Sequence, residues 1–425
     1  MTTARLVRFS ILTVAFSIQF FVLGARRADA CTTAVVSGAA TADGRPLLWK
    51  NRDTKQRDNE VVFIGDGKYP IVAVANAGSV ANAGSSGSIW MGVNGAGFCI
   101  ENSLSNDLAV TEKMKGPGNG GFMLIALKTC ATVEDFAELC GRTDGERTTT
   151  ANIGVIDAQG GAALFEIGPK SHVRFEATGE ATERGYLVRS NFSMTANGFD
   201  GEPESGALAN VYSSERYARA CSLLERGKQA EEGLAIGYFL RKCARDLADD
   251  QGRPVPGTVN ASGGESPKRI ATKNTISRRT TVSAAVFHGV RPGEAPQLTT
   301  MWTFLGDPTF SIAVPCWPTS RGVAPELDGE RVSELCSQAR ELRDACYSED
   351  GEAIDSARLA DIYRRTWSVE DEIVRQTQEK LAAWRKATPT DEEIYAFHRE
   401  MAQEAQSALR SLVSDLAPAA ATATQ

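Results

Sequence analysis

Histidine is scarce in this chain: its 425 residues include only three, His172, His288 and His398. The first lies in a polar, strand-like stretch, the second at the end of a predicted strand, and the third on a predicted C-terminal helix. No His, Cys and carboxylate residues recur at the spacing of metal ligands. The sequence therefore argues against metal catalysis and a catalytic histidine, although a Cys–His couple stays formally open. No motif in the sequence indicates a cofactor.

Long apolar runs and excess positive charge are also missing. Beyond the first thirty residues, no stretch approaches the roughly 20 apolar residues that a membrane-spanning helix needs. The formal net charge is −7, and it becomes −10 for residues 31–425 because residues 1–30 carry four Arg and one Asp. An acidic surface disfavours nucleic acid and anionic membranes as partners. We expect no nucleic-acid partner and no stable membrane insertion, and the oligomeric state stays open.

Residues 1–30 have the three parts of a secretory signal peptide. A positively charged start precedes the almost wholly apolar stretch Phe9–Leu23, and Ala28 and Ala30 occupy the small-residue positions before a cut. The mature protein is then predicted to begin at Cys31 and to be secreted or periplasmic. A lipid-anchored protein would also begin with cysteine, but Ala28 and Asp29 fit the lipidation signal poorly.

A cut before Cys31 would expose a thiol and a free α-amino group on one residue. An N-terminal amine can take the proton that a Cys or Ser loses when it attacks a carbonyl carbon. Its ordinary pKa of about 7.7–8.0 suits that task near neutral pH. This arrangement predicts an N-terminal-nucleophile hydrolase, and the scarcity of histidine favours the amine as the base.

The chain has nine cysteines, and the eight besides Cys31 are an even number that permits disulfides in an exported protein. Cys336 and Cys346 share one helical pattern and lie about 15 Å apart along it, which is too far for a bond between them. Two pairings stay open: Cys221 with Cys243, and Cys130 with Cys140. In the alternative interpretation, several of these cysteines are buried free thiols that pack as small hydrophobic residues.

Residues 31–318 read mostly as short strands rich in β-branched and aromatic residues. The predicted strands are 32–37, 46–51, 60–64, 71–75, 89–93, 98–101, 151–157, 162–167, 186–189, 281–287, 299–304 and 310–314. Helical patterns interrupt them at 120–141, 212–226 and 231–248, which indicates an α+β fold with helices outside layered sheets. The stretch 249–280 reads as a long surface loop.

The composition changes after residue 318. Residues 328–347, 355–386 and 391–416 have apolar positions at three- and four-residue spacing, and Thr390 with Glu393 forms a capping-box pattern. We therefore expect a helical C-terminal region over 319–418, whose simplest role is to pack on the main domain, and a disordered tail over 419–425.

Two motifs at the start of the predicted mature chain carry a family resemblance. Cys31–Gly38 (CTTAVVSG) and Asp43–Asp53 (DGRPLLWKNRD) resemble the opening of linear-amide C–N hydrolases related to isopenicillin-N acyltransferase and choloylglycine hydrolase. The Cys-Thr-Thr start is also similar to N-terminal-cysteine dipeptidases of the same superfamily. The resemblance implies that Asp53 orients the amine and thiol, and it assigns Lys50, where the family often has Arg, to substrate binding. Locally, Asp53 is simply an acidic residue that ends a strand.

Three later motifs match the family more loosely. Trp90–Phe98 (WMGVNGAGF) is similar to a Gly-x-Asn-x-x-Gly hairpin, which implies that Asn94 helps to form the oxyanion hole, although Asn-Gly is also an ordinary hairpin turn. Arg189–Phe192 (RSNF) resembles a strand-end Thr-Asn motif and implies a polar site residue at Asn191. The helix start SERYAR implies that Arg216 lies beneath the nucleophile; a helix-surface arginine is the alternative.

The resemblance covers residues 31–318 and implies a four-layer αββα fold with the terminal cysteine in a cleft. The expected activity is hydrolysis of a small-molecule or peptide amide: Cys31 attacks, its own amine shuttles the proton, and Asn94 with backbone amides holds the oxyanion. An amine acceptor in place of water would make the enzyme an acyltransferase. One alternative is an N-terminal-cysteine dipeptidase. Another is a catalytically inactive secreted binding protein, which an acylated or disulfide-bonded Cys31 would favour.

Overall fold

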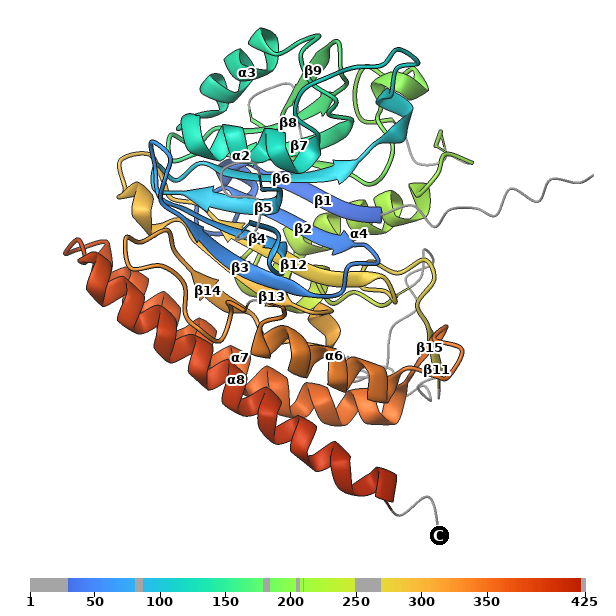
Figure 1. Cartoon of the computed structure of the whole chain (residues 1–425), viewed down its shortest axis with the longest axis vertical. Coiled ribbons are helices and arrows are strands. Elements are labelled where there is room, and N and C mark those ends of the chain that lie inside the picture. Colours follow the sequence, from blue (N-terminus) through green and yellow to red (C-terminus); the bar gives the residue numbers. More distant parts are fainter. Residues whose placement is uncertain are drawn as a thin grey trace, which may run out of the picture.

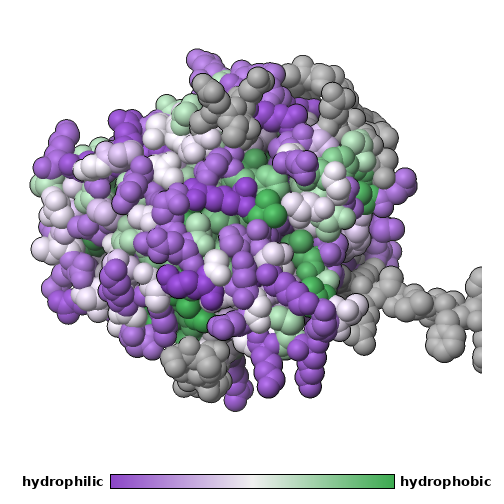
Figure 2. Space-filling view, turned by 90° about the horizontal axis from the view of Figure 1, so that it is seen from above, coloured by the Kyte–Doolittle hydropathy of each residue, from purple (hydrophilic) through white to green (hydrophobic). Residues whose placement is uncertain are grey.

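The computed structural model describes residues 30–80, 87–178, 184–203, 207–208, 210–248, 269–329 and 331–421, with side chains to 416 (Figure 1). Residues 1–29 of the predicted signal peptide lie outside the described residues, as do 249–268 of the predicted loop and 422–425 of the predicted tail. Within the described part, no helix is both long and apolar enough to cross a membrane. On the face seen in Figure 2, hydrophilic side chains predominate and hydrophobic areas are small.

The first sheet carries the predicted N-terminal strand near one edge. Its antiparallel strands follow the order β10-β1-β2-β12-β13-β14. Their bounds are β1 Ala30–Val36, β2 Leu47–Asp53, β10 Tyr186–Arg189, β12 Thr281–His288, β13 Thr300–Leu305 and β14 Val314–Cys316. These strands are buried along their whole length. They therefore read as nearly continuous apolar runs in which the few polar residues stand out.

The second sheet is an antiparallel meander in chain order, from β3 to β9. Its strands are β3 Asn59–Ile64, β4 Ile71–Asn76, β5 Ile89–Asn94, β6 Cys99–Leu104, β7 Ala151–Ile156, β8 Ala162–Ile167 and β9 His172–Glu176. The two sheets pack face to face. At Gly154 an added Cβ would lie 2.9 Å from side-chain atoms of Val35 and Leu48, which belong to the other sheet. Glycine thus lets the sheets approach closely in front of β1 and β2.

Helices cover both outer faces of this sandwich (Figure 1). Helices α2 (Asn119–Thr129) and α3 (Val133–Arg142) pack on the second sheet, and α4 (Ser214–Gln229), α5 (Ile236–Tyr238) and the π-helical η5 (Phe239–Cys243) pack on the first. One apolar core fills the space between the sheets and beneath α4, and another lies between the second sheet and α2 and α3. The four-layer αββα arrangement implied by the resemblance is confirmed.

The C-terminal helices extend the layer outside the first sheet. They are α6 (Glu334–Cys346), α7 (Ser356–Trp384) and α8 (Asp391–Ala421), which reaches the first residues of the predicted tail. Trp317 packs against Trp384 and Phe397 with ring centroids 5.7 Å and 6.1 Å apart. The buried ion pair between Arg245 and Glu370 links α7 to the main domain. These helices therefore share the core of the first sheet.

Several predicted boundaries were wrong for local reasons. The expected strand at 310–314 is instead the 3-10 helix η7 (Pro308–Phe310) followed by β14, because Asp307 caps η7 and Pro308 begins it. The expected helix at 120–141 divides into α2 and α3, because Thr132 forms a capping box with Asp135 and starts a new helix. Strand β9 and the short pair β11 (Arg269–Ala271) and β15 (Ala353–Asp355) were not predicted.

The cysteines form no disulfides: all nine lie in the described part of the chain, and all are free thiols. Eight are buried and Cys221 is half-buried. Cys130 caps the C-terminal end of α2 and Cys140 lies near the end of α3, and both are buried free thiols. Burial raises the pKa of Cys130 to about 11 and that of Cys140 to about 12. The disulfide interpretation is therefore corrected in favour of packed, unreactive thiols.

Candidate active site

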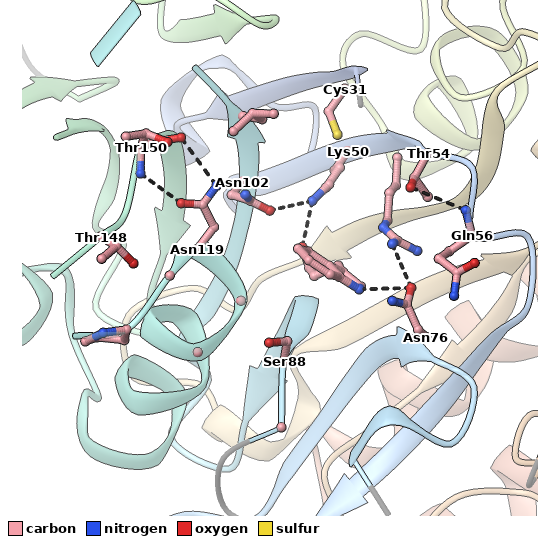
Figure 3. Close-up of a pocket in the computed structure, with 18 of the residues that line it drawn as sticks. Cys31, Lys50, Thr54, Gln56, Asn76, Ser88, Asn102, Asn119, Thr148 and Thr150 are labelled. Atoms are coloured by element: carbon pink, nitrogen blue, oxygen red, sulfur yellow. Dashed lines mark hydrogen bonds between the residues drawn. The ribbon is translucent and has the colours of Figure 1, made fainter. Parts of the chain in front are cut away.

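Cys31 is the second residue of β1 and lies opposite Arg52 of β2. Its side chain is only 7% exposed and lines a cavity of about 770 Å³ between the two sheets. Lys50, Asp53 and Asn102 line the same cavity, and Figure 3 shows the Cys31 thiol above the Lys50 side chain, whose amine points toward Asn102. The strand pairing of β1 with β2 thus brings two of the sequence-predicted residues, Lys50 and Asp53, beside the cysteine.

On the other face of β1, Arg216 and Asn191 hold the backbone of Cys31. The Cys31 N–H donates to Asn191 Oδ1 at 2.7 Å, and Arg216 Nη2 donates to the same oxygen at 2.8 Å. Arg216 Nη1 donates to the Cys31 carbonyl and, at 2.9 Å, to Thr32 Oγ1. Arg216 is buried, which lowers its pKa to about 10 and leaves it a cation at neutral pH. The structure brings both predicted residues to the cysteine as supports of its main chain.

Asp53 ends β2 and faces the cysteine with its backbone. Its backbone N–H contacts the Cys31 thiol. The carboxylate accepts hydrogen bonds from Thr281 Oγ1 and Arg278 Nε, each at 2.6 Å. Because both oxygens are bonded and the side chain is buried, Asp53 is fixed in position next to the nitrogen side of Cys31.

Lys50 enters a gap between β5 and β6. The ladder of these strands ends at the pair Met91 and Glu101, so the next residues, Trp90 and Asn102, do not pair with each other. Lys50 Nζ donates to the Trp90 carbonyl at 2.7 Å and to Asn102 Oδ1 at 2.8 Å (Figure 3). Burial lowers the pKa of Lys50, while the neighbouring Cys31 and Glu101 raise it. The ammonium is thus held between the thiol and an asparagine side chain.

The environment of Cys31 favours the neutral thiol in the uncut chain. Burial is the largest effect and raises the pKa of the Cys31 thiol; the charge of Lys50 lowers it and that of Asp53 raises it. A thiol of this kind attacks a carbonyl only if a neighbouring base removes its proton. The α-nitrogen of the same residue, fixed by Asn191, is the group closest to it along the chain.

Asn94 does not lie where an oxyanion donor must lie. Its Nδ2 donates to the carbonyls of Leu127 and Cys130, both at 2.8 Å, and its Oδ1 accepts from the amides of Ala96 and Phe98, both at 3.1 Å. The side chain is fully buried and is absent from the cavity lining. Asn94 therefore closes the hairpin and caps the end of α2, and the predicted oxyanion role is corrected.

Asn102 is a better candidate for that donor. It lies on β6, lines the cavity and is 4% exposed. Lys50 holds its Oδ1, and its Nδ2 makes no hydrogen bond to any described residue in the structure. It was not among the predicted site residues, because the strand predicted there ended at Glu101. The available signal was the run of three polar residues, Glu101 to Ser103, in an otherwise apolar buried strand.

Glu101 is a second polar group that the sequence analysis did not single out. It points between the sheets and is fully buried, with the Thr33 hydroxyl, the Gly154 amide and Lys50 as polar neighbours. Burial raises its pKa to about 8, against the opposing effect of Lys50. At neutral pH the group beneath Lys50 is therefore mainly a neutral carboxylic acid.

The rest of the cavity wall carries several polar side chains. Arg52 stacks on Trp90 at 4.7 Å and donates to Asn76 Oδ1 at 2.7 Å. The lining also includes the glycine-rich start of α2 and further side chains with amide or hydroxyl groups: Gln56, Ser88, Asn119, Thr148 and Thr150. Such a wall suits a substrate with hydrogen-bonding groups near the reacting bond.

Histidine and metal sites are absent from this region. None of the three histidines lines the cavity. His398 is buried against the Pro315 carbonyl, and burial lowers its pKa to about 4. Nowhere in the described ranges do three His, Cys, Asp or Glu residues form a group that could hold a metal ion.

Comparisons with known proteins give weak similarities. No family model matches the sequence, and no curated protein does. A mutant of conjugated bile acid hydrolase from Clostridium perfringens matches with a TM-score of 0.41 and 11% identity over 71% of this chain and 94% of its own. Penicillin V acylase from Agrobacterium tumefaciens matches with 0.38 and 13% over 68% and 85%. A Caenorhabditis elegans N-acylethanolamine-hydrolyzing acid amidase ortholog matches with 0.36 and 12% over 63% and 93%. At these values, assignment of function depends on the site itself.

Proposed function

We propose that this protein is an exported amidase of the N-terminal-nucleophile type, which cleaves linear amide C–N bonds through a thioester on Cys31. One observation carries the proposal. The nitrogen and the sulfur of Cys31 belong to one residue whose main chain is fixed from both sides, by Asn191 at the nitrogen and Arg216 at the carbonyl. Signal cleavage after Ala30 would convert that fixed nitrogen into an amine beside the thiol.

In the proposed reaction, the α-amine takes the thiol proton and Sγ forms a bond to the amide carbonyl carbon. The negative charge moves to the carbonyl oxygen, where the Asn102 amide can donate a hydrogen bond. The protonated α-amine then gives its proton to the leaving nitrogen as the C–N bond breaks. A water molecule attacks the thioester, loses a proton to the α-amine and releases the acid and the free thiol. An amine in place of water would give acyl transfer.

Lys50 supports this chemistry by position and charge. Its bond to Asn102 Oδ1 fixes the amide so that Nδ2 faces the cavity. Its positive charge also lowers the pKa of the Cys31 thiol and thus eases loss of the proton. We infer that Lys50 positions the oxyanion donor in addition to any contact it makes with substrate.

The test combines N-terminal sequencing with intact-mass detection of acyl adducts against an amide library. We expect the exported protein to begin at Cys31 and to gain single acyl masses, and we expect Cys31→Ala to gain none. The other eight cysteines serve as an internal control, since they are free thiols in the same chain. A different N-terminus, a lipid on Cys31 or adducts that persist in the variant would contradict the mechanism. Preferential cleavage of dipeptides would identify a dipeptidase, and stable binding without adducts would identify an inactive binding protein.

A further inference from the structure

A second cavity of about 530 Å³ adjoins the first, and Thr54 lines both. One wall is the segment that follows β2. The opposite wall comes from the residues before β12 and from the end of α6 with the turn that follows it, Arg343 to Gly351. The helical C-terminal region thus contributes directly to a cavity that shares Thr54 with the cavity of Cys31.

The second cavity is cationic. Four basic side chains line it, and they are Lys55, Arg57, Arg279 and Arg343. The acidic residues among its described lining are Asp344 and Glu349. This excess of positive charge contrasts with a chain whose formal net charge is −7. A concave site of one sign with low-dielectric walls concentrates the potential toward ligands of the opposite sign.

Ion pairs around the second cavity do not fully neutralise its excess of positive charge. Asp344 accepts from both Arg57, at 2.6 Å, and Arg343, at 2.9 Å, so one carboxylate serves two guanidinium groups. Arg279 is 43% exposed and lies 3.2 Å from Glu352. Lys55 is exposed and makes no ion pair with any described residue. Lys55 and Arg279 are therefore exposed cations that do not share the Asp344 carboxylate.

The first cavity also has more basic than acidic side chains in its described lining. Lys50 and Arg52 line it, and its one described carboxylate, Asp53, is paired with Arg278 at 2.6 Å. Arg52 lies opposite Cys31, so Thr54 is two residues farther along the chain, about 7 Å at the rise of an extended strand. Lys55 follows one residue later, beyond the end of β2, so its backbone lies at most about 10 Å from that of Arg52.

We propose that the two cavities form one extended binding site, in which the second holds an anionic group of the substrate about 10 Å from the scissile carbonyl. This inference rests on the proposed amidase function and specifies its substrate class: an extended amide, such as a short peptide or a peptide-like chain, with a carboxylate or similar anion three or so residue lengths from the reacting bond. Residues of the C-terminal helical region then have a role in specificity.

The probes are oligoglycine p-nitroanilides that differ only in their caps. Succinyl-capped and acetyl-capped chains of one to four glycines present a carboxylate or a neutral methyl group at graded distances. Each probe is assayed for kcat/KM and, separately, as a protectant of Cys31 against alkylation by iodoacetamide, which requires no turnover. We expect the succinyl probes to be favoured about fivefold to tenfold at low salt, most at two or three glycines, with the preference falling as salt rises.

The decisive variant is Lys55→Gln with Arg279→Gln, which removes the two exposed cations that Asp344 does not pair. We expect its succinyl-to-acetyl ratio to fall to about one through a higher KM for the succinyl probes, with kcat for acetyl probes unchanged. Lys170→Gln with Arg375→Gln is the matched control, because both side chains are at least half exposed, form surface ion pairs and lie outside both cavity linings. This control should keep the preference.

The possible outcomes test the anionic subsite separately from the amidase function. Equal protection by the two caps, or a preference that survives in Lys55→Gln/Arg279→Gln, would overturn the anionic subsite even if the enzyme cleaves amides well. Selective protection without turnover of any probe would support the subsite and count against the amidase. If the control variant also lost the preference for succinyl probes, the preference would depend on the net charge of the protein and not on the second cavity. That result would also overturn the subsite.

Discussion

The two ends of the β5–β6 hairpin hold two asparagines with opposite surroundings. At the closed end, Asn94 uses both its carbonyl oxygen and its amide in hydrogen bonds to the turn and to the end of α2. At the open end, the strands separate after Met91 and Glu101, and Asn102 has its oxygen held by Lys50 and its amide toward the cavity. About 13 Å of strand separates the two ends.

This difference shows what separates a structural polar residue from one that can take part in chemistry. The structural residue has partners for all its hydrogen-bond donors and acceptors, whereas the other has a donor without a partner. A buried amide whose donors and acceptor are all bonded contributes to stability and has nothing left for a ligand. A buried amide group whose N–H donors are unbonded in a cavity lowers the stability of the free protein, and it can stabilise an oxyanion when one forms. Substitutions at the two ends should therefore affect different measurements.

The largest loss of kcat is expected at Lys50, because this side chain affects both the Cys31 thiol and the Asn102 amide. Lys50→Met removes the charge that lowers the pKa of the thiol and frees the Asn102 amide to rotate, so kcat should fall by about 10³-fold or more. Lys50→Arg should recover part of the loss because it keeps the charge. Single-turnover acylation measures both, and equal rates in Lys50→Met and the wild type would remove Lys50 from the mechanism.

Asn102→Ala should come next, with a fall in kcat of about 10²–10³-fold and little change in thermal stability, because its amide matters most once the oxyanion has formed. The double variant with Lys50→Met should lose less than the sum of the two single losses in free energy, since Lys50 acts in part through Asn102. Fully additive losses would show that the two side chains act independently.

At the closed end, Asn94→Ala should destabilise the fold by about 2–4 kcal/mol while kcat changes only a few-fold, because several buried groups lose their partners. Urea unfolding and acylation rates on one preparation provide the measurement. A large loss of kcat with unchanged stability would restore the oxyanion role to Asn94 and reverse the comparison.

Glu101→Gln should have the smallest effect on kcat, and its effect on stability depends on pH. Folding raises the pKa of Glu101 from 4.5 to about 8. Between these values the folded protein keeps a proton that the unfolded chain loses, so stability falls as pH rises through this window and levels off above it. The glutamine variant lacks this contribution. Urea unfolding from pH 5 to 8.5 should therefore show the wild type losing stability relative to the variant; parallel curves would mean that Glu101 is charged throughout.

Sequence alone was sufficient where the signal was local. Strands β1 and β2 follow from β-branched and apolar runs, α7 and α8 from helical spacing, and the motif residues Lys50 and Asp53 lie beside Cys31 because neighbouring antiparallel strands place them there. These features depend on residues that are close along the chain or on one strand pairing.

The features that were missed depend on distant contacts. Asn102 becomes available because β5 and β6 separate and Lys50 of the other sheet enters the gap, which no pattern within β6 encodes. The second cavity joins Lys55 to Arg343, nearly 290 residues away along the chain. The state of the cysteines depends on packing around helix ends and strand interiors, so an even count could not decide it.

The anchoring of Cys31 has a consequence for how activity would begin. Arg216 holds the Cys31 carbonyl and Thr32, both on the C-terminal side of the predicted cut, while Ala30 contributes one pair to the ladder, opposite Asp53. Cleavage after Ala30 would therefore remove one ladder pair and leave the anchors of the cysteine untouched. Under the proposed function, the uncut chain would be a zymogen in which the anchors of Cys31 are already in place and only one peptide bond blocks the amine. Activation would require hydrolysis of that bond and no refolding.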